Sequence, residues 1–287
     1  MGRVFDPIAV LADYVSGGDV LVLTGAGIST DSGIPDYRGA NGSLRRYTPM
    51  TFQAFVSEDA ARQRYWARSQ LGWRRFAAAR PNVGHDMVAR LQQLGLLSGI
   101  ITQNVDGLHQ AAGAFDVIDL HGRLDRVVCL SCRCLLSRDE LDVMLRAANP
   151  SFGADVVAMN PDGDAEIPDD ELGGFRVVAC RSCGGVLKPD VVFFGENVPR
   201  PTVDRCFSLL ERSRLLLVLG SSLTVMSGYR FVRRAVRDGV PVAIVNQGPT
   251  RGDADAELVV EAAIAAALTQ LRTLLPDRIH QPVGHVE

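Results

Sequence analysis

Five short apolar runs alternate along this chain with stretches of helical periodicity, and this alternation constrains the fold most strongly. The runs cover residues 20–24, 99–102, 117–120, 215–219 and 242–246, and none shows the polar alternation of a half-exposed strand. Helical patterns lie beside them at residues 8–15, 82–94, 201–211, 228–237 and 262–274. Buried strands separated by helices predict an α/β fold with a doubly wound, Rossmann-like parallel sheet. Such a sheet binds its ligand beyond the carboxyl ends of its strands.

Composition excludes several classes of protein. With 30 Lys plus Arg against 33 Asp plus Glu, the formal net charge of −3 argues against a nucleic-acid partner. No apolar window approaches the roughly 18 residues of a membrane span. The first residues, MGRVFDPIAVLADYV, show no basic stretch followed by an apolar run, so we expect no signal peptide. We therefore expect a cytoplasmic protein without a membrane partner, whose six cysteines favour metal binding over disulfides.

Two cysteine pairs carry the most specific spacing in the chain. Cys129 and Cys132 form one C-x-x-C pair, and Cys180 and Cys183 form the other. Two such knuckles supply four thiolates, which close the coordination sphere of a tetrahedral Zn²⁺ and make the ion structural. The alternative interpretation is a set of redox dithiols or of scattered buried cysteines.

The region around these pairs interrupts the alternation of strands and helices. Between residues 155 and 171 it carries seven acidic and no basic residues, which is typical of a solvated loop. We predict a small zinc-binding module at residues 124–187, inserted into a larger Rossmann-like domain made of residues 1–123 and 188–287. Cys134 lies two residues beyond Cys132 and makes the register ambiguous. The knuckle spacing leaves Cys134 and Cys206 as ordinary thiols.

A glycine-rich turn follows the first predicted strand directly. Gly25 and Gly27 form a Gly-x-Gly turn, which lets the backbone approach a pyrophosphate and lets the next helix offer free N–H groups. The third glycine of the usual dinucleotide fingerprint is replaced by Thr30, which disfavours a hydride-transferring dehydrogenase but not a dinucleotide. The alternative is that the glycines serve strand–helix packing alone.

Small polar clusters follow the other predicted strands. Gln103, Asn104 and Asp106 follow residues 99–102, and His121 ends residues 117–120. The clusters 220–222 and 246–248 follow the last two strands. Each has an ordinary explanation, because Asn and Asp cap helices and a single His is more often structural. Together they place polar groups at the ends of all five strands, where this architecture binds its ligand.

The segment 188–196, KPDVVFFGE, is extended and apolar, with Pro189 near its start. An edge strand of this kind can pair with an extended peptide. It also holds Lys188, the single lysine among the 30 basic residues, beside the predicted peptide groove.

In this order, these motifs resemble the sirtuin family of NAD-dependent protein lysine deacylases. The matching strings are GAGIST, SGIPDYR, TQNVDGLH, the HG at 121–122, both cysteine pairs, KPDVVFFGE, GSSLTV and NQGPT, and they span residues 20 to 250. The strings RQRYWAR, GSSLTVMSGYRF and NQGPTRGDADAEL are most similar to class II.

The resemblance implies a role for each matching residue. His121 would be the general base, and Asn104 would act with it. An acyl-lysine peptide would add as a strand beside Val191, Val192, Phe193, Phe194 and Gly195. The residues that would hold NAD are Gly25, Ala26, Gly27, Ile28, Ser29, Asp36, Tyr37, Arg38, Gln103, Asn104, Val105, Asp106, Gly220, Ser221, Ser222, Asn246, Gln247, Gly248 and Ile264.

The reaction implied by the resemblance consumes NAD and moves no hydride. Nicotinamide leaves, the acyl oxygen attacks C1′ of the ribose, and His121 takes a proton from the ribose hydroxyls. Water completes the reaction, so that the acyl group ends on ADP-ribose and the lysine is released as a free amine.

The preferred acyl group is left open. Tyr65 and Arg68 form the Tyr-x-x-Arg pattern that reads the carboxylate of succinyl- or malonyl-lysine in another sirtuin class, and Arg suits a bidentate carboxylate contact. The alternative is a solvated face of a helix. Two other functions stay open: mono-ADP-ribosyl transfer from the same NAD site, and a non-enzymatic nucleotide sensor. The sensor has no need of His121, Asn104 and Asp106 together.

Overall fold

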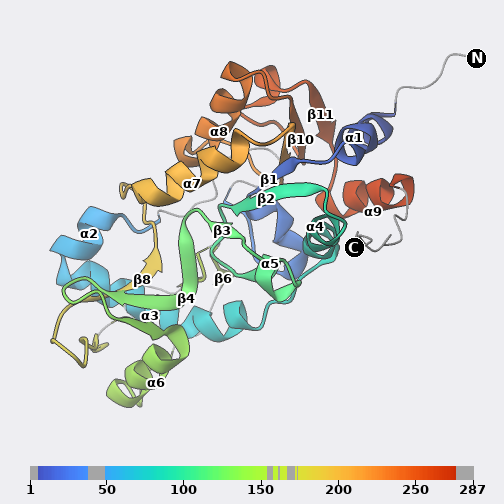
Figure 1. Ribbon diagram of the computed structural model, residues 1–287. Helices are drawn as coiled ribbons and strands as arrows, with labels where there is room; N and C mark the ends of the chain where they lie inside the picture. The colour runs from blue at the N-terminus through green and yellow to red at the C-terminus, as the bar shows by residue number, and fades with distance from the viewer. Residues whose placement is uncertain are drawn as a thin grey trace, which may run out of the picture.

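The computed structural model describes residues 6–37, 49–153, 158–160, 162–166, 172 and 174–275. A parallel sheet of six strands forms its larger part, in the order β11-β10-β9-β1-β2-β3 (Figure 1). Its strands are β1 (Val20–Thr24), β2 (Leu97–Thr102), β3 (Ile118–Asp119), β9 (Leu215–Leu219), β10 (Val242–Asn246) and β11 (Leu258–Glu261). Strands β2 and β3 lie on one side of β1, and the later strands β9, β10 and β11 lie on its other side. The carboxyl ends of β1 and β9 therefore flank the point where the strand order reverses, which is where such sheets bind ligands.

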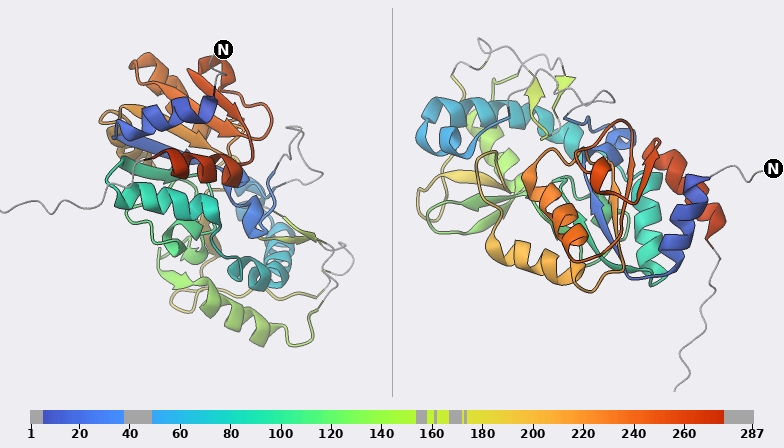
Figure 2. Two further views of the ribbon diagram at one scale, coloured as in Figure 1. Left: turned by 90° about the vertical axis from the view of Figure 1, so that its right-hand side faces the viewer. Right: turned by 90° about the horizontal axis from the view of Figure 1, so that it is seen from above.

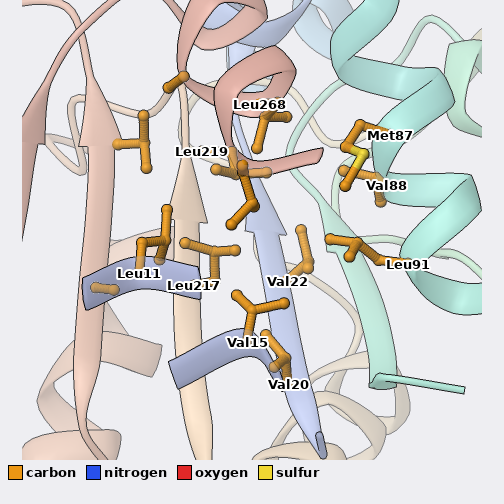
Figure 3. Close-up of a cluster of buried hydrophobic side chains, with 14 of the residues drawn as sticks. Leu11, Val15, Val20, Val22, Met87, Val88, Leu91, Leu217, Leu219 and Leu268 are labelled. Atoms are coloured by element: carbon orange, nitrogen blue, oxygen red, sulfur yellow. The ribbon is translucent and has the colours of Figure 1, made fainter. Parts of the chain in front are cut away.

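Helices cover both faces of this sheet, so the predicted doubly wound α/β architecture is confirmed (Figures 1 and 2). The helices α1 (Pro7–Ser16), α4 (Val83–Gln93) and α9 (Ile264–Leu274) pack on one face, and α7 (Arg200–Leu210) and α8 (Met226–Arg237) on the other. Figure 3 shows Leu11, Met87 and Leu268 from the first group meeting Val22 and Leu217 of the sheet. All five residues of β1 and of β9 are buried, which explains their unbroken apolar sequence.

The structure adds one strand to the five predicted from the apolar runs. In β11 the burial alternates along Leu258–Glu261, as expected of a strand at the edge of the sheet, and its apolar run is only three residues long. The turn after β1 also differs from the expectation. Two short 3-10 turns, η1 (Ala26–Ile28) and η2 (Thr30–Ser32), follow β1 in place of the helix that a Gly-x-Gly turn usually leads into. They end at Gly33, whose φ is 83°, and Pro35 comes soon after.

A second, smaller group of elements packs beside the carboxyl end of the sheet. Its antiparallel sheet has the order β5-β4-β8, formed by β4 (Gly122–Cys129), β5 (Leu135–Ser137) and β8 (Leu187–Val191). The hairpin-like pair β6 (Ala158–Met159) and β7 (Ala165–Glu166) lies apart from it. The helices of this group are α2 (Phe52–Ser57), α3 (Asp59–Ala77) and α6 (Arg138–Ala148), and α5 (Leu108–Ala111) links β2 to β3.

This group has a hydrophobic core of its own. The core joins Phe55, Tyr65 and Trp66 of α2 and α3 to Leu124 of β4 and Leu141 of α6. The helix α3 therefore packs with residues far from it in sequence. The domain limits at 123/124 and 187/188 stay a prediction. The first falls inside β4, and the second falls between the first two residues of β8.

Within the part of the chain that the structure describes, no helix combines the length and the apolar character that a membrane crossing requires.

Candidate functional site

The loops after β1 and β9 lie in direct contact, and their glycines make this contact possible. The Gly25 and Gly27 N–H groups donate to the carbonyl oxygens of Leu219 and Gly220 over 3.0 and 2.8 Å. A Cβ at Gly25 would lie 2.7 Å from the Ser221 Cβ, and one at Gly27 would lie 2.9 Å from the Gly220 Cα. Gly220 itself has φ of 64°. Packing between two loops thus explains these glycines, while it also fixes the backbone that faces the crevice.

Ser29, Asn104 and Asp106, all predicted to face the nucleotide, meet in one hydrogen-bond network. The Ser29 hydroxyl donates to Asp106 Oδ2 over 2.7 Å, and Asn104 Nδ2 donates to Ser29 Oγ over 3.0 Å. Asn104 Nδ2 also reaches the Gly25 carbonyl at 3.1 Å. The buried His85 of α4 lies 3.4 Å from Ser29 Oγ through its Nε2. His85 is not among the residues predicted from the sequence, and its Nδ1 accepts from the Asn82 N–H in a helix-capping box.

Gln103 and Ser221 connect this network to the β9 side of the crevice. Gln103 Nε2 donates to Ser221 Oγ over 2.8 Å. Nearby, the Ser222 hydroxyl lies 3.1 Å from the Thr224 hydroxyl, and the Asn246 amide closes a turn onto the Gly248 carbonyl at 2.8 Å. These residues follow the ends of neighbouring strands, β9 and β10. Ile264, in contrast, is buried among core residues at the start of α9.

His121, just beyond β3, is held through both of its ring nitrogens. Its Nδ1 lies 2.9 Å from the carbonyl oxygen of Gln103, which accepts only, so Nδ1 carries a proton. Its Nε2 lies 2.8 Å from the hydroxyl of Ser227, at the start of α8. Burial, followed by the positive charge of Arg230, lowers the pKa of His121 against the opposing effect of the Gln103 carbonyl. The ring is therefore neutral at pH 7, with a proton-free Nε2 that accepts from Ser227.

Ser227 contacts the candidate base, although it was not among the residues predicted from the sequence. It belongs to the string GSSLTVMSGYRF, but there only the residues before position 223 were assigned to the site. Nothing in its local sequence indicates contact with His121, because the two residues lie 106 positions apart.

The segment after β8 runs beside His121. Among the described residues β8 is an edge strand of the three-stranded sheet, because it pairs with β4 alone. The Val192 N–H donates to the His121 carbonyl over 2.8 Å, and Phe194 forms an isolated parallel bridge with Thr51. This segment thus lies next to the candidate base, with the Phe193 N–H bonded to Glu196 Oε2 and the Phe193 carbonyl bonded to the Glu196 N–H.

Lys188 is buried below this segment. Its Nζ pairs with Glu196 Oε2 at 2.9 Å, and it also contacts the Val191 carbonyl. Its side chain is only 4% exposed, so the single lysine does not offer a free amine to the groove.

Two aromatic contacts involve predicted substrate residues, one of them with Tyr37, which was predicted to hold NAD. The rings of Tyr37 and Phe194 lie 6.3 Å apart, and those of Tyr65 and Phe193 lie 5.3 Å apart. Tyr65 is buried, and Arg68 is partly buried one turn later on α3. Arg38 lies outside the described residues.

The two cysteine pairs form loops with the same hydrogen bonds. In the first, the Cys129 N–H donates to the Cys134 carbonyl (2.9 Å) and the Arg133 N–H donates to the Cys129 carbonyl (3.0 Å). In the second, the Cys180 N–H donates to the Gly185 carbonyl (2.9 Å) and the Gly184 N–H donates to the Cys180 carbonyl (2.8 Å). Arg133 and Gly184 both have positive φ, at 62° and 72°. By this correspondence, Cys132 matches Cys183, and Cys134 takes the place of Gly185.

Five sulfurs gather between these loops. The Sγ atoms of Cys129, Cys132, Cys134 and Cys180 all lie within 4.8 Å of one another. Cys183 Sγ lies 3.5 Å from Cys129 Sγ. Zinc–sulfur bonds of about 2.3 Å in a tetrahedron place sulfurs roughly 3.8 Å apart, so the gathered thiols fit one Zn²⁺. Cys134, expected to be an ordinary thiol, lies 3.3 Å from Cys132 Sγ and 3.4 Å from Cys180 Sγ. Cys206 is buried apart from them, in the core under α7.

Comparisons with known proteins agree with this arrangement. The model of the Sir2 family matches residues 25–227, most of the chain. This chain belongs to the Sir2 family. NAD-dependent protein deacetylase 1 of Streptomyces coelicolor is 58% identical over 95% of this chain and 91% of that protein. The NAD-dependent protein deacetylase of Xanthomonas axonopodis pv. citri is 54% identical over 88% of this chain and 86% of that protein.

Solved structures of Sir2 proteins have a fold similar to that of this chain. A structure described as Sir2 with a p53 peptide and NAD+ has a TM-score of 0.75 and 29% identity, over 92% of this chain and 96% of that one. Sir2 membership confirms the family resemblance found in the sequence. The assignment of single residues to nucleotide, peptide or metal stays a prediction.

Proposed function

We propose that this Sir2-family chain is an NAD-dependent protein lysine deacylase of the deacetylase type. It transfers the acyl group of an acyl-lysine to ADP-ribose and releases nicotinamide. The observation that carries the proposal is His121, a neutral imidazole with a proton-free Nε2 beside the Asn104 and Asp106 network. Relatives named as NAD-dependent protein deacetylases at 58% and 54% identity support the same reaction.

The residues of this chain have separate roles in the reaction. The loops of Gly25 and Gly220 fix the backbone that receives the pyrophosphate, and Ser29 and Asp106 orient polar groups toward the nicotinamide side. NAD supplies the chemistry when bound, because loss of nicotinamide makes C1′ of its ribose electrophilic. His121 then accepts a proton at Nε2, while its Nδ1–H stays on the Gln103 carbonyl and stabilises the resulting imidazolium.

The acyl-lysine peptide adds as a strand beside the segment that follows β8. The support is the edge position of β8 and the hydrogen bond from Val192 to the His121 carbonyl, which places this backbone beside the base. A solved Sir2 structure described with a p53 peptide and NAD+ is consistent with this class of partner.

The structural zinc is held by Cys129, Cys132, Cys180 and Cys183. The matching hydrogen bonds of the two loops support this set, because they make these cysteines equivalent in pairs. Cys134 then occupies the position of Gly185 and lies against the site without binding the ion.

An acyl-peptide assay tests the reaction. Acetyl-lysine peptides are incubated with the purified protein, with and without NAD, and their masses are measured. Wild type is expected to remove the acyl group only with NAD, and His121→Ala is expected to lose more than about 100-fold of this activity, the usual contribution of a general base. Exposed Gln93→Ala is the control and keeps it. The absence of NAD-dependent mass loss on every acyl peptide would overturn the proposal.

The acyl preference is tested with acetyl-, succinyl-, glutaryl- and lipoyl-lysine peptides. We propose that Arg68, on α3 beside the aromatic core of Tyr65, reads an acidic acyl group. Arg68→Met is then expected to reduce succinyl and glutaryl turnover by tenfold or more, as loss of a bond to a charged group does, and to spare acetyl turnover. Equal loss on all four peptides, or none, would contradict this role.

Cytoplasmic location and the lack of a nucleic-acid partner stay predictions from the sequence. Cytoplasmic location is tested by fractionation, and the lack of a nucleic-acid partner is tested by a binding assay with duplex DNA at low salt.

A further inference from the structure

The hydroxyl of Ser227 occupies the position that a substrate must reach. The only lone pair of the neutral His121 ring is on Nε2, because Nδ1 gives its proton to the Gln103 carbonyl at 2.9 Å. Ser227 Oγ lies 2.8 Å from Nε2 and must be the donor. Without substrate, the base is therefore already hydrogen-bonded by a side chain from another element.

The two hydrogen bonds of the ring come from opposite sides of the crevice. Gln103 follows β2, while Ser227 lies in the first turn of α8. This turn packs directly against the Gln103 side chain, because a Cβ at Gly228 would lie 2.5 Å from Gln103 Oε1. The helix α8 is thus docked against the same residue whose carbonyl holds Nδ1, which fixes Ser227 relative to the ring.

We propose that Ser227 is a positioning residue for His121. It holds the imidazole plane and keeps Nε2 proton-free and aimed into the crevice until a ribose hydroxyl takes its place. The ribose proton then passes to Nε2, giving an imidazolium, while Ser227 rotates away and keeps its own proton. The inference rests on the proposed function in one respect, namely that a ribose hydroxyl is the group His121 deprotonates.

A merely structural role for Ser227 would be to stabilise the first turn of α8. Val225 is the N-cap of this helix and makes no side-chain capping bond, so polar groups near this end could also serve its stability. The two roles differ in what they predict for the ring. Only positioning alters the hydrogen bonding of Nε2 and the turnover of bound substrate while leaving peptide affinity unchanged.

The test compares Ser227→Ala, Ser227→Thr and the matched exchange Ser208→Ala on an exposed position of α7. The first readout is the ¹⁵N chemical shift of the His121 ring nitrogens in full-length, substrate-free protein, assigned by comparison with His121→Ala. The chain has five histidines, which keeps the spectrum simple. The second readout is kcat and KM for an acetyl-lysine peptide at saturating NAD.

The expected spectrum of wild type shows a protonated Nδ1 and an unprotonated, hydrogen-bonded Nε2. In Ser227→Ala the Nε2 signal moves toward the value of a free imidazole nitrogen, and kcat falls about five- to tenfold with KM unchanged, the effect of one aligning hydrogen bond. Ser227→Thr restores both values, and Ser208→Ala changes neither.

Three results would overturn the inference: a protonated Nε2 in wild type, an unchanged Nε2 signal in Ser227→Ala, or a rise in KM without a fall in kcat. The ring spectrum does not depend on turnover. If wild type removes no acyl group but the spectrum changes as expected, the proposed function fails and the Ser227–His121 contact stands. If wild type is active and the spectrum is unchanged, only the role of Ser227 fails.

Discussion

At the residue scale, the candidate site depends on polar side chains whose partners are fixed by the fold. His121 is the clearest case, because the Gln103 carbonyl decides which nitrogen carries the proton and burial decides that the ring is neutral. A histidine with an unshifted pKa would be half protonated near pH 6.5, and a protonated ring cannot act as a base. Lowering the pKa extends the pH range in which His121 can accept a proton.

The acid limb of the pH–rate profile tests this shift. Arg230 lowers the pKa of His121, so Arg230→Gln raises that pKa and moves the acid limb of kcat/KM to higher pH. In wild type we expect the half-maximal point below pH 6.5, the ordinary value for histidine. Arg233→Gln, an exposed change on the same helix, is expected to leave the limb in place. An acid limb that does not move in Arg230→Gln would contradict the electrostatic account.

Lys188 and Glu196 form an ion pair next to the site. The Lys188 side chain is 4% exposed and the Glu196 side chain 25%, and burial lowers the pKa of Lys188 while Glu196 opposes this effect. Lys188→Met is expected to reduce the free energy of unfolding by about 1.5–3 kcal/mol, the usual worth of hydrogen bonds to a charged group. Urea unfolding of both single variants and of Lys188→Met with Glu196→Gln measures the coupling. Strictly additive losses would show that the two side chains do not stabilise each other.

At the element scale, the two cysteine loops show what a short motif does and does not specify. The C-x-x-C spacing predicted a metal knuckle at each pair, and the matching backbone hydrogen bonds are what such a motif requires. The spacing did not reveal that Cys134 would join the cluster, because that depends on how the loop closes. Arg133 has φ of 62° and turns the chain so that Cys134 pairs back with Cys129.

Zinc content distinguishes the ligands from the additional thiol. One zinc per chain is expected in wild type, by elemental analysis of the purified protein. Ser variants of Cys129, Cys132, Cys180 and Cys183 are expected to lose the ion and melt at lower temperature, because structural zinc contributes directly to folding. Cys134→Ser and Cys206→Ser are expected to keep it. Loss of zinc in Cys134→Ser with full zinc in Cys183→Ser would exchange the roles of these two cysteines.

At the scale of the whole molecule, the sequence predicts the large sheet well, and for a physical reason. Three of the predicted strands, 20–24, 215–219 and 242–246, have the observed bounds, because strands covered on both faces must be apolar throughout. The edge strand Leu258–Glu261 is buried on one face only and lacks this pattern.

Contacts between distant segments are the part of the site that the sequence could not predict. Tyr65 and Trp66 have a helical pattern, but only the fold shows that they share a core with Leu124 and Leu141. In the same way, Ser29, Asn104 and Asp106 were predicted individually from strand ends, while the hydrogen bonds among them follow from the strand order β9-β1-β2. His85 and Ser227 carried no local signal at all, since their contacts with the site exist only in the folded chain.

The central claim is that an acyl group leaves lysine for ADP-ribose as NAD is consumed. The stoichiometry of products measures this directly, by mass spectrometry of one reaction with an acetyl-lysine peptide. We predict equal amounts of free-lysine peptide, nicotinamide and O-acetyl-ADP-ribose, all absent in His121→Ala apart from any nicotinamide released before its base is needed. Nicotinamide release with an intact acetyl peptide and ADP-ribose attached to protein would contradict the claim and identify an ADP-ribosyltransferase.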